Sequence, residues 1–170
     1  MRRLLDREPR LWFSVSANTR APREGEVDGR DYLFISREQF RALEAAGGFL
    51  ESFQVYDDLK GTPREPVREH HAAGDDVLLE LDVQGALAVR EAYPDALLVF
   101  VKPPSREVQR ERLLARPDTH ADADALARRL AKADAEEALS ARFDAVVVNE
   151  DLDQAVGEVA AILEARRGAG

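Results

Sequence analysis

The chain has 170 residues, of which 45% are hydrophobic and 34% charged, and 24 Lys and Arg against 33 Asp and Glu give a formal net charge of −9. This length and composition predict one globular domain with room for a small inserted lobe, and the negative charge argues against nucleic acid as the main partner. The absence of cysteine excludes a disulfide framework and a thiolate zinc site, and no apolar run is long enough for a membrane span or a secretion signal, so we predict a cytoplasmic protein.

Short helices and strands alternate with turns in the first half of the chain. Ser36, followed three residues later by Gln39, predicts a capped helix that Gly47 and Gly48 end. The remaining predicted elements are helices over 2–8 and 63–73, strands over 11–16, 32–35 and 49–56, and a turn-rich loop over 17–30.

The second half of the chain is more regular, and its predicted strands are almost wholly apolar. These strands span 76–82, 96–101 and 145–148, and the predicted helices span 84–92, 105–115, 123–140 and the segment from 151 onward. Ser105 and Asp151 are predicted to cap the second and the last of these helices. Nearly all-apolar strands separated by helices are typical of a parallel sheet that is covered on both faces. The sequence therefore predicts an α/β fold, with a small mixed lobe inserted in its first half.

Polar side chains follow three of the predicted strands. They are Ser14 and Ser16, Glu80 and Asp82, and Asn149 and Glu150. Ligands of parallel sheets bind beyond the carboxyl ends of the strands, so these residues predict one shared ligand site. A purely structural role stays open, because any strand that leaves a sheet needs polar residues at its exit.

The loop that follows the first predicted strand carries two arginines close together. Arg20 and Arg23 lie three residues apart around Pro22, which stiffens the turn. Two guanidinium groups in such a turn can converge on one phosphate, and the hydroxyl of Tyr32 can donate to the same anion. The alternative is a pair of arginines on a solvated loop.

The same loop resembles the signature of guanylate kinases, from Ser14-Val15-Ser16 through Arg20-Ala21-Pro22-Arg23 to Asp28-Gly29. Further matches follow in register at 31–34, 49–51, 61–63, 79–85 and 148–153, so the resemblance covers nearly the whole chain. It implies a P-loop-kinase-like parallel sheet flanked by helices, with an inserted GMP-binding lobe at about 18–75 and a helical lid at about 112–129. It also implies phosphoryl transfer from ATP to GMP with Mg²⁺, and GMP and ATP as the partners.

Carried over by position, the resemblance implies a GMP site. Its phosphate would be held by Arg20, Arg23 and Tyr32, and its guanine by Ser16, Glu51, Thr62 and Glu80. A carboxylate suits guanine, because N1–H and the exocyclic amine form two adjacent donors that adenine lacks.

The resemblance also implies residues on the side of the phosphate donor. Asp82 would lie near the phosphates and Mg²⁺, although no residue of the chain is predicted to bind the ion directly. Asn149 would lie near the adenine ring. The lid arginines that would neutralise charge in the transfer are Arg112, Arg116 and Arg129.

The sequence departs from the family in the phosphate-binding loop. It contains no G-x-x-x-x-G-K-[S/T], the motif that cradles the ATP phosphates and supplies a hydroxyl to Mg²⁺, and its first residues resemble the later part of the helix that follows that loop. We therefore expect that Met1 is an internal methionine of a longer protein and that the chain as written has impaired activity. The alternative is a catalytically inactive module that binds GMP or a protein partner.

Two smaller departures bear on the predicted site. Lys60 stands where the family has a tyrosine before a glycine, and it could meet the GMP phosphate as a point charge that Asp57 and Asp58 would oppose. Pro117 replaces a glycine in the lid and would stiffen a segment that has to move.

Overall fold

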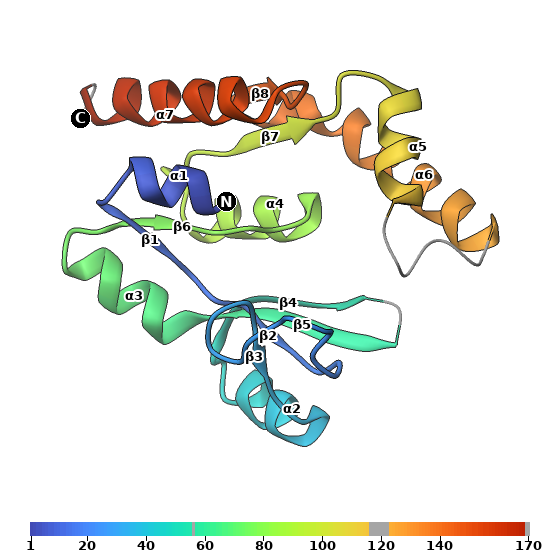
Figure 1. The fold of residues 1–170 in the computed structure, drawn as a ribbon. Coiled ribbons are helices and arrows are strands. Elements are labelled where there is room, and N and C mark those ends of the chain that lie inside the picture. The colour runs from blue at the N-terminus through green and yellow to red at the C-terminus, as the bar shows by residue number, and fades with distance from the viewer. Residues whose placement is uncertain (56, 116–122, 169–170) are drawn as a thin grey trace. The chain divides into compact units, whose positions relative to one another are not determined.

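A computed structural model describes residues 1–55, 57–115 and 123–168 (Figure 1). Helices and strands alternate along the chain, in an α/β fold. The chain forms two compact units, one of Glu8–Ala96 and the other of Met1–Arg7 with Leu97–Gly170. Within the described parts of the chain, no helix has the length and apolar character that crossing a membrane requires.

The unit Glu8–Ala96 contains a two-stranded parallel sheet of β1 (Leu11–Phe13) and β6 (Asp76–Leu78). Trp12 of β1 stacks on the ring of His70, with ring centroids 3.9 Å apart. Both strands are shorter than predicted. The polar residues predicted for a ligand site, Ser14 and Ser16 after β1 and Glu80 and Asp82 after β6, therefore lie beyond the strand ends.

A four-stranded sheet forms the rest of this unit's β structure, in the order β3 (Leu33–Phe34), β2 (Ala17–Asn18), β5 (Asp58–Pro63) and β4 (Phe49–Val55). Strands β2 and β3 are parallel, whereas β5 runs antiparallel to both β2 and β4. The prediction of a loop over 17–30 was wrong at its start, and β5 was not predicted at all, since its glycine, proline and charged residues lower strand propensity. Pairing on both sides overcomes that low propensity.

Three helices accompany these sheets: α2 (Arg37–Ala45), α3 (Arg64–Ala72) and α4 (Val83–Ala92). The predicted capping box of α2 is confirmed, because Ser36 accepts from the backbone of Gln39 and the Gln39 side chain accepts from the backbone of Ser36. Gly47 follows α2 with a φ of 70°, a conformation that other residues rarely adopt. Fully buried Phe40 of α2 stacks on Phe49, with centroids 4.4 Å apart, and fixes the helix on the sheet.

The second unit pairs β7 (Val99–Lys102) with β8 (Ala145–Val148) in parallel. Its helices are α1 (Arg2–Arg7), α5 (Arg106–Leu114), α6 (Ala123–Ala138) and α7 (Leu152–Gly168), with the 3₁₀ helix η1 (Ser140–Arg142) before β8. Helix α7 packs on both α1 and β8. The predicted caps at Ser105 and Asp151 are confirmed by their bonds to the backbones of Val108 and Gln154.

The prediction that the parallel strands are buried on both faces was wrong for β7 and β8. Val147 is fully buried, but Val101, Val146 and Val148 are 53%, 41% and 40% exposed. Within the described residues three pairs of strands are parallel: β1–β6 and β2–β3 in the unit Glu8–Ala96, and β7–β8 in the other unit. Alternating exposure along β8 is what a strand covered on one face shows, so apolar composition alone overstated its burial.

Candidate functional site

A small hollow of about 20 Å³ opens in the unit Glu8–Ala96. Its lining residues are Phe13, Ser16, Asp31, Tyr32, Lys60 and Glu80. Three of them, Ser16, Tyr32 and Glu80, are residues predicted for a ligand site from distant parts of the sequence. The fold therefore brings them to one place.

Backbone pairing explains how these residues come together. The chain leaves β1 at Ser14, whose N–H donates to the carbonyl of Leu78 at the end of β6. Ser16, 7% exposed, then accepts a backbone bond from Leu33, which places the start of β3 beside it. The ends of β1 and β6 and the start of β3 are thus fixed to one another through main-chain bonds. The residues at or near these ends that line the hollow are Phe13, Ser16, Tyr32 and Glu80.

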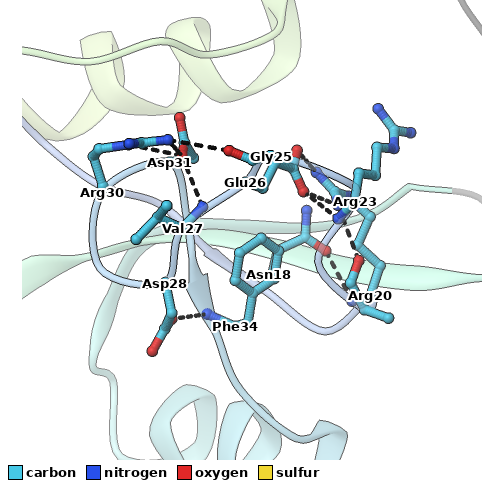
Figure 2. Close-up of polar contacts among 11 residues, drawn as sticks. Asn18, Arg20, Arg23, Gly25, Glu26, Val27, Asp28, Arg30, Asp31 and Phe34 are labelled. Atoms are coloured by element: carbon cyan, nitrogen blue, oxygen red, sulfur yellow. Dashed lines mark hydrogen bonds and ion pairs between the residues drawn. The ribbon is translucent and has the colours of Figure 1, made fainter.

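Arg20 is held by a carboxylate that the sequence analysis did not single out. Its two terminal nitrogens each donate to an oxygen of Glu26 at 2.6 Å, and the backbone N–H of Arg23 donates to the same carboxylate at 2.7 Å (Figure 2). The guanidinium also donates to the carbonyl of Ala21 at 3.0 Å. Glu26 therefore fixes the orientation of one predicted phosphate-binding arginine and the backbone of the other.

The electrostatics of this pair follow from its geometry. Hydrogen bonds from Arg20 lower the pKa of Glu26 from 4.5 to about 2, and the bond to Glu26 raises the pKa of Arg20. The Arg20 guanidinium carbon lies 5.0 Å from the ring centroid of Tyr32 and 5.4 Å from that of Phe34. Two aromatic rings and one bidentate carboxylate thus surround the guanidinium, and the bidentate contact favours the charged form of both Arg20 and Glu26.

The rest of the loop is tied down by side-chain bonds to the backbone. Asp31 accepts from the N–H of Val27 at 2.9 Å and from Arg30 at 2.6 Å, and Asp28 accepts from the N–H of Phe34 at 2.8 Å (Figure 2). Asn18 accepts from the N–H of Arg20. The loop that sequence reasoning predicted only as turn-rich is therefore a preorganised structure.

Glu51 is buried on the paired strands β4 and β5. The residue is 7% exposed, and one carboxylate oxygen accepts a bond of 2.6 Å from the hydroxyl of Thr62, its partner in the strand register. The other oxygen, Oε2, is buried and has no hydrogen-bond partner among the described residues. Burial raises the pKa of Glu51, an effect that Thr62 and Lys60 partly offset. An unpartnered buried acceptor is costly, and this one is ready for an external donor.

The surroundings of Glu51 connect it to the start of α4. A Cβ built on Gly85 would lie 3.3 Å from Oε2 of Glu51 and 3.5 Å from Oδ1 of Asp82, so glycine leaves room between the two carboxylates. Asp82 caps α4 by accepting from the N–H of Gly85 at 3.0 Å. Among the residues that the structure describes, no group of three or more His, Asp or Glu side chains could hold a metal ion.

The remaining predicted residues belong to the second unit. Arg112 donates to the carbonyl of Asn149 at 2.8 Å, which links the predicted lid arginine to the predicted adenine position. Arg129 lies half-buried on α6, and Arg116 falls outside the described residues. A hollow of about 410 Å³ between α5 and α6 is lined by other residues of those helices, and neither Arg112 nor Arg129 is among them.

Comparison with known proteins gives this arrangement a family. A family model described as guanylate kinase matches residues 1–166. The chain belongs to the guanylate kinase family. It is 50% identical to a guanylate kinase of a Synechococcus species, over 94% of this chain and 84% of the relative, and 49% identical to one of Symbiobacterium thermophilum, over 98% and 78%.

A solved structure agrees with these sequence relatives. The crystal structure of guanylate kinase from Anaplasma phagocytophilum has a TM-score of 0.81 and 32% identity, over 96% of this chain and 78% of that one. The family and the α/β fold class predicted from the sequence are therefore confirmed. The guanylate kinase resemblance did not assign roles to Glu26, Asn18 or Phe34, which support Arg20 here. Sequence reasoning missed Glu26, and the one signal that could have found it is a glutamate three residues after Arg23 in the same loop.

Proposed function

We propose that the protein transfers the terminal phosphoryl group of ATP to GMP, giving ADP and GDP. The observation that carries this proposal is the carboxylate of Glu51, buried, held at one oxygen by Thr62 and unpartnered at the other. Guanine presents two adjacent N–H donors on one edge, and these can donate to the carboxylate oxygen of Glu51 that has no partner within the described residues. Adenine lacks the N1–H donor and would leave the buried oxygen unpaired, which is how a polar site rejects the wrong base.

The acceptor side of the reaction is assigned to the unit Glu8–Ala96, and chiefly to the lobe at about 18–75. Arg20, Arg23 and Tyr32 hold the GMP phosphate, since the first two are joined through Glu26 and the third stacks beside Arg20. The remaining guanine-side residues are Ser16, Thr62 and Glu80. In the transfer, an oxygen of the GMP phosphate forms a bond to the γ-phosphorus of ATP, and the bond to the bridging oxygen of ADP breaks.

The donor side is assigned to Arg112, Arg116 and Arg129, within a lid at about 112–129, with Asn149 near the adenine ring. These arginines spread positive charge over the transferring group. Mg²⁺ usually takes only one or two carboxylates and completes its shell with phosphate oxygens and water, so the single Asp82 carboxylate fits a place beside it. When bound with ATP, the ion supplies neutralisation of phosphate charge. The reaction is one of cytoplasmic nucleotide metabolism.

A second candidate function is binding of GMP without transfer. It is favoured by one observation, the absence of a G-x-x-x-x-G-K-[S/T] motif from the 170 residues. In this case the acceptor site keeps its selectivity and no phosphoryl group moves. A protein partner held by the same lobe is a variant of this candidate.

Calorimetric titration of the chain with GMP and AMP tests the acceptor site first. We expect GMP to bind about a hundredfold more tightly than AMP, because AMP leaves the Glu51 oxygen unpaired. Equal affinity for the two nucleotides would exclude a guanine site. Formation of ADP and GDP from MgATP and GMP then distinguishes the two candidates, since only the transferase produces them.

A further inference from the structure

Helix α5 has no buried face of its own. All nine of its residues belong to the described part of the chain, and none of them is buried. Helices α5 and α6 contact each other (Figure 1), but both line the hollow of about 410 Å³, so apolar packing does not fill the space between them. A helix without a buried face depends on polar contacts for its position, because apolar packing usually fixes a helix in a protein.

One such contact lies in the second half of α5. Arg112 donates to the carbonyl of Asn149 at 2.8 Å and to that of Glu150 at 3.5 Å. These carbonyls belong to the turn between β8 and α7. The contact therefore fixes Arg112 beside this turn only if α5 keeps its orientation.

A second contact lies at the first residue of α5. Arg106 forms an ion pair with Asp134 on α6, and its Nη2 lies 3.6 Å from Oε2 of Glu137 on the same helix. Arg106 and Arg112 are six residues apart, which places them about 120° apart around the helix axis. The two arginines thus hold α5 on two different sides.

Glu137 connects this contact to the sheet. Its Oε1 accepts a bond of 2.8 Å from Nζ of Lys102, the last residue of β7, while its Oε2 faces Arg106. The hydrogen bond from Lys102 lowers the pKa of Glu137 most, and the charges of Lys102 and Arg106 lower it further. A single ion pair of partly exposed side chains contributes little, but a carboxylate shared by two cations joins β7, α5 and α6 at one point.

We propose that Glu137 is a positioning residue, which joins Lys102 to Arg106 and thereby sets the orientation of α5 and the place of Arg112 beside the turn at 149–150. The consequence for phosphoryl transfer rests on the proposed function, in which Arg112 acts on the donor side. The orientation of α5 itself does not depend on that function. Because the three side chains are partly exposed, dissolved salt weakens the network.

The test measures the distance between spin labels on α5 and α7 by pulsed electron paramagnetic resonance. The chain has no cysteine, so Glu111→Cys and Glu158→Cys, both at exposed positions, supply the only attachment sites. Helix α7 is the reference, because it packs on β8. We expect Glu137→Gln to broaden the distance distribution about twofold or more, since α5 loses its link to β7.

Salt gives a readout that a general loss of stability does not change. Between about 0.1 M and 1 M NaCl the Debye length falls from about 10 Å to about 3 Å, so we expect the distribution of the unsubstituted chain to broaden. The distribution of Glu137→Gln is already broad and responds less. A distribution that Glu137→Gln leaves unchanged in width and in salt dependence overturns the inference.

Glu136→Gln is the matched control, because Glu136 is the preceding residue of α6 and pairs with Lys132 of the same helix at 3.4 Å. Equal broadening in this control overturns the inference, since it would reflect the charge of α6 alone. Lys102→Met removes the same link from the strand side and keeps the test valid if Glu137→Gln does not fold. We expect the double variant to broaden the distribution no more than Glu137→Gln does, and additive effects would exclude a shared contact.

Binding of GMP separates this inference from the proposed function. The GMP site is assigned to the unit Glu8–Ala96, whereas Glu137 belongs to the other unit. We therefore expect Glu137→Gln to bind GMP within about twofold of the unsubstituted chain. Failure of the unsubstituted chain to bind GMP overturns the proposed function, while the label distances alone decide the role of Glu137.

Discussion

The loop of residues 20–31 and the paired strands β4 and β5 each contribute a glutamate to the same unit, and the two glutamates have opposite surroundings. Glu26 is matched by Arg20 on both oxygens, and its pKa falls to about 2. Glu51 is buried with one oxygen unpartnered, and burial raises its pKa. Glu26 therefore has a structural role, because both of its oxygens are hydrogen-bonded within the protein. Glu51 instead keeps one oxygen to which a ligand can donate a hydrogen bond.

This contrast also separates two kinds of preorganisation. In the loop, the carboxylate of Glu26 holds Arg20, so the guanidinium is oriented before a ligand binds. In the strands, folding has already removed water from the unpartnered oxygen of Glu51, so a ligand that donates to this oxygen does not have to displace its hydration. Substitutions in the two regions therefore have different consequences for affinity and for stability.

The largest expected effect comes from Glu51→Gln. The amide N–H groups of the glutamine side chain would face the N–H groups of guanine, and two donors cannot bond to each other. We therefore expect the preference for GMP over AMP, measured as the ratio of the two dissociation constants, to fall about a hundredfold. The raised pKa of Glu51 predicts a second effect, on stability. The free energy of unfolding decreases as the pH rises through the folded-state pKa of Glu51, because the buried carboxylate becomes charged, and Glu51→Gln does not show this decrease. Glu65→Gln on α3, which removes an exposed glutamate paired with Arg68, is the control. An undiminished preference would remove Glu51 from base selection.

Glu26→Gln sharpens the other side of the comparison. Arg20 loses its bidentate partner, and we expect GMP affinity to fall about tenfold because the guanidinium is no longer oriented. The folded-state pKa of about 2 lies below the ordinary 4.5, so Glu26 contributes stability above pH 4.5 that is lost as the pH falls toward 2.

The free energy of unfolding, measured with denaturant between pH 5 and pH 2.5, therefore falls less steeply with decreasing pH in Glu26→Gln than in the unsubstituted chain. Glu44→Gln is the control for GMP affinity, since Glu44 also pairs with an arginine, Arg41, and does not line the hollow. Hydrogen bonds from Ser52 and Arg41 lower the pKa of Glu44 too, so we expect the acid dependence to flatten in both variants and GMP affinity to fall only in Glu26→Gln. Tighter GMP binding in Glu26→Gln would mean that this carboxylate competes with the ligand and does not support it.

The smallest expected effect comes from Ser36→Ala, in the helix that joins the two regions. Helix α2 begins after β3 and ends before β4, and its capping box is complete. We expect a loss of about 1 kcal/mol in the free energy of unfolding, with GMP affinity unchanged within twofold. Ser105→Ala removes the corresponding cap of α5 and is the comparison in the other unit. A large change in GMP affinity would show that both glutamates depend on where α2 sits.

Local signals in the sequence predicted local structure well. The capping box at Ser36 and the caps at Ser105 and Asp151 were correct, because each depends on residues within three positions. Strand β5 was missed, because Gly61 and Pro63 lower strand propensity and the pairing that stabilises it comes from β2 and β4. Burial of β8 was overestimated, because composition does not say whether one or both faces are covered.

The candidate site followed the same division. Glu51 and Thr62 were assigned by resemblance, but only the strand register shows that they are bonded to each other. The pairing of Arg20 with Glu26 was not predicted, because a charge run in a loop does not reveal which side chains meet. Lys60 was identified as a departure that could meet the GMP phosphate as a point charge, and the structure adds that its ammonium lies 5.4 Å from the ring centroid of Tyr32.

The stack of Trp12 on His70 gives the protein a built-in optical probe. Trp12 is the sole tryptophan of the sequence, and it lies in the unit Glu8–Ala96 with its ring nearly parallel to the imidazole, at 11°. Indole emission therefore monitors the opening of this unit alone, while circular dichroism averages over both. If the two signals change at different denaturant concentrations, the units unfold separately, and an emission change on adding GMP is assigned to the unit that holds Glu51.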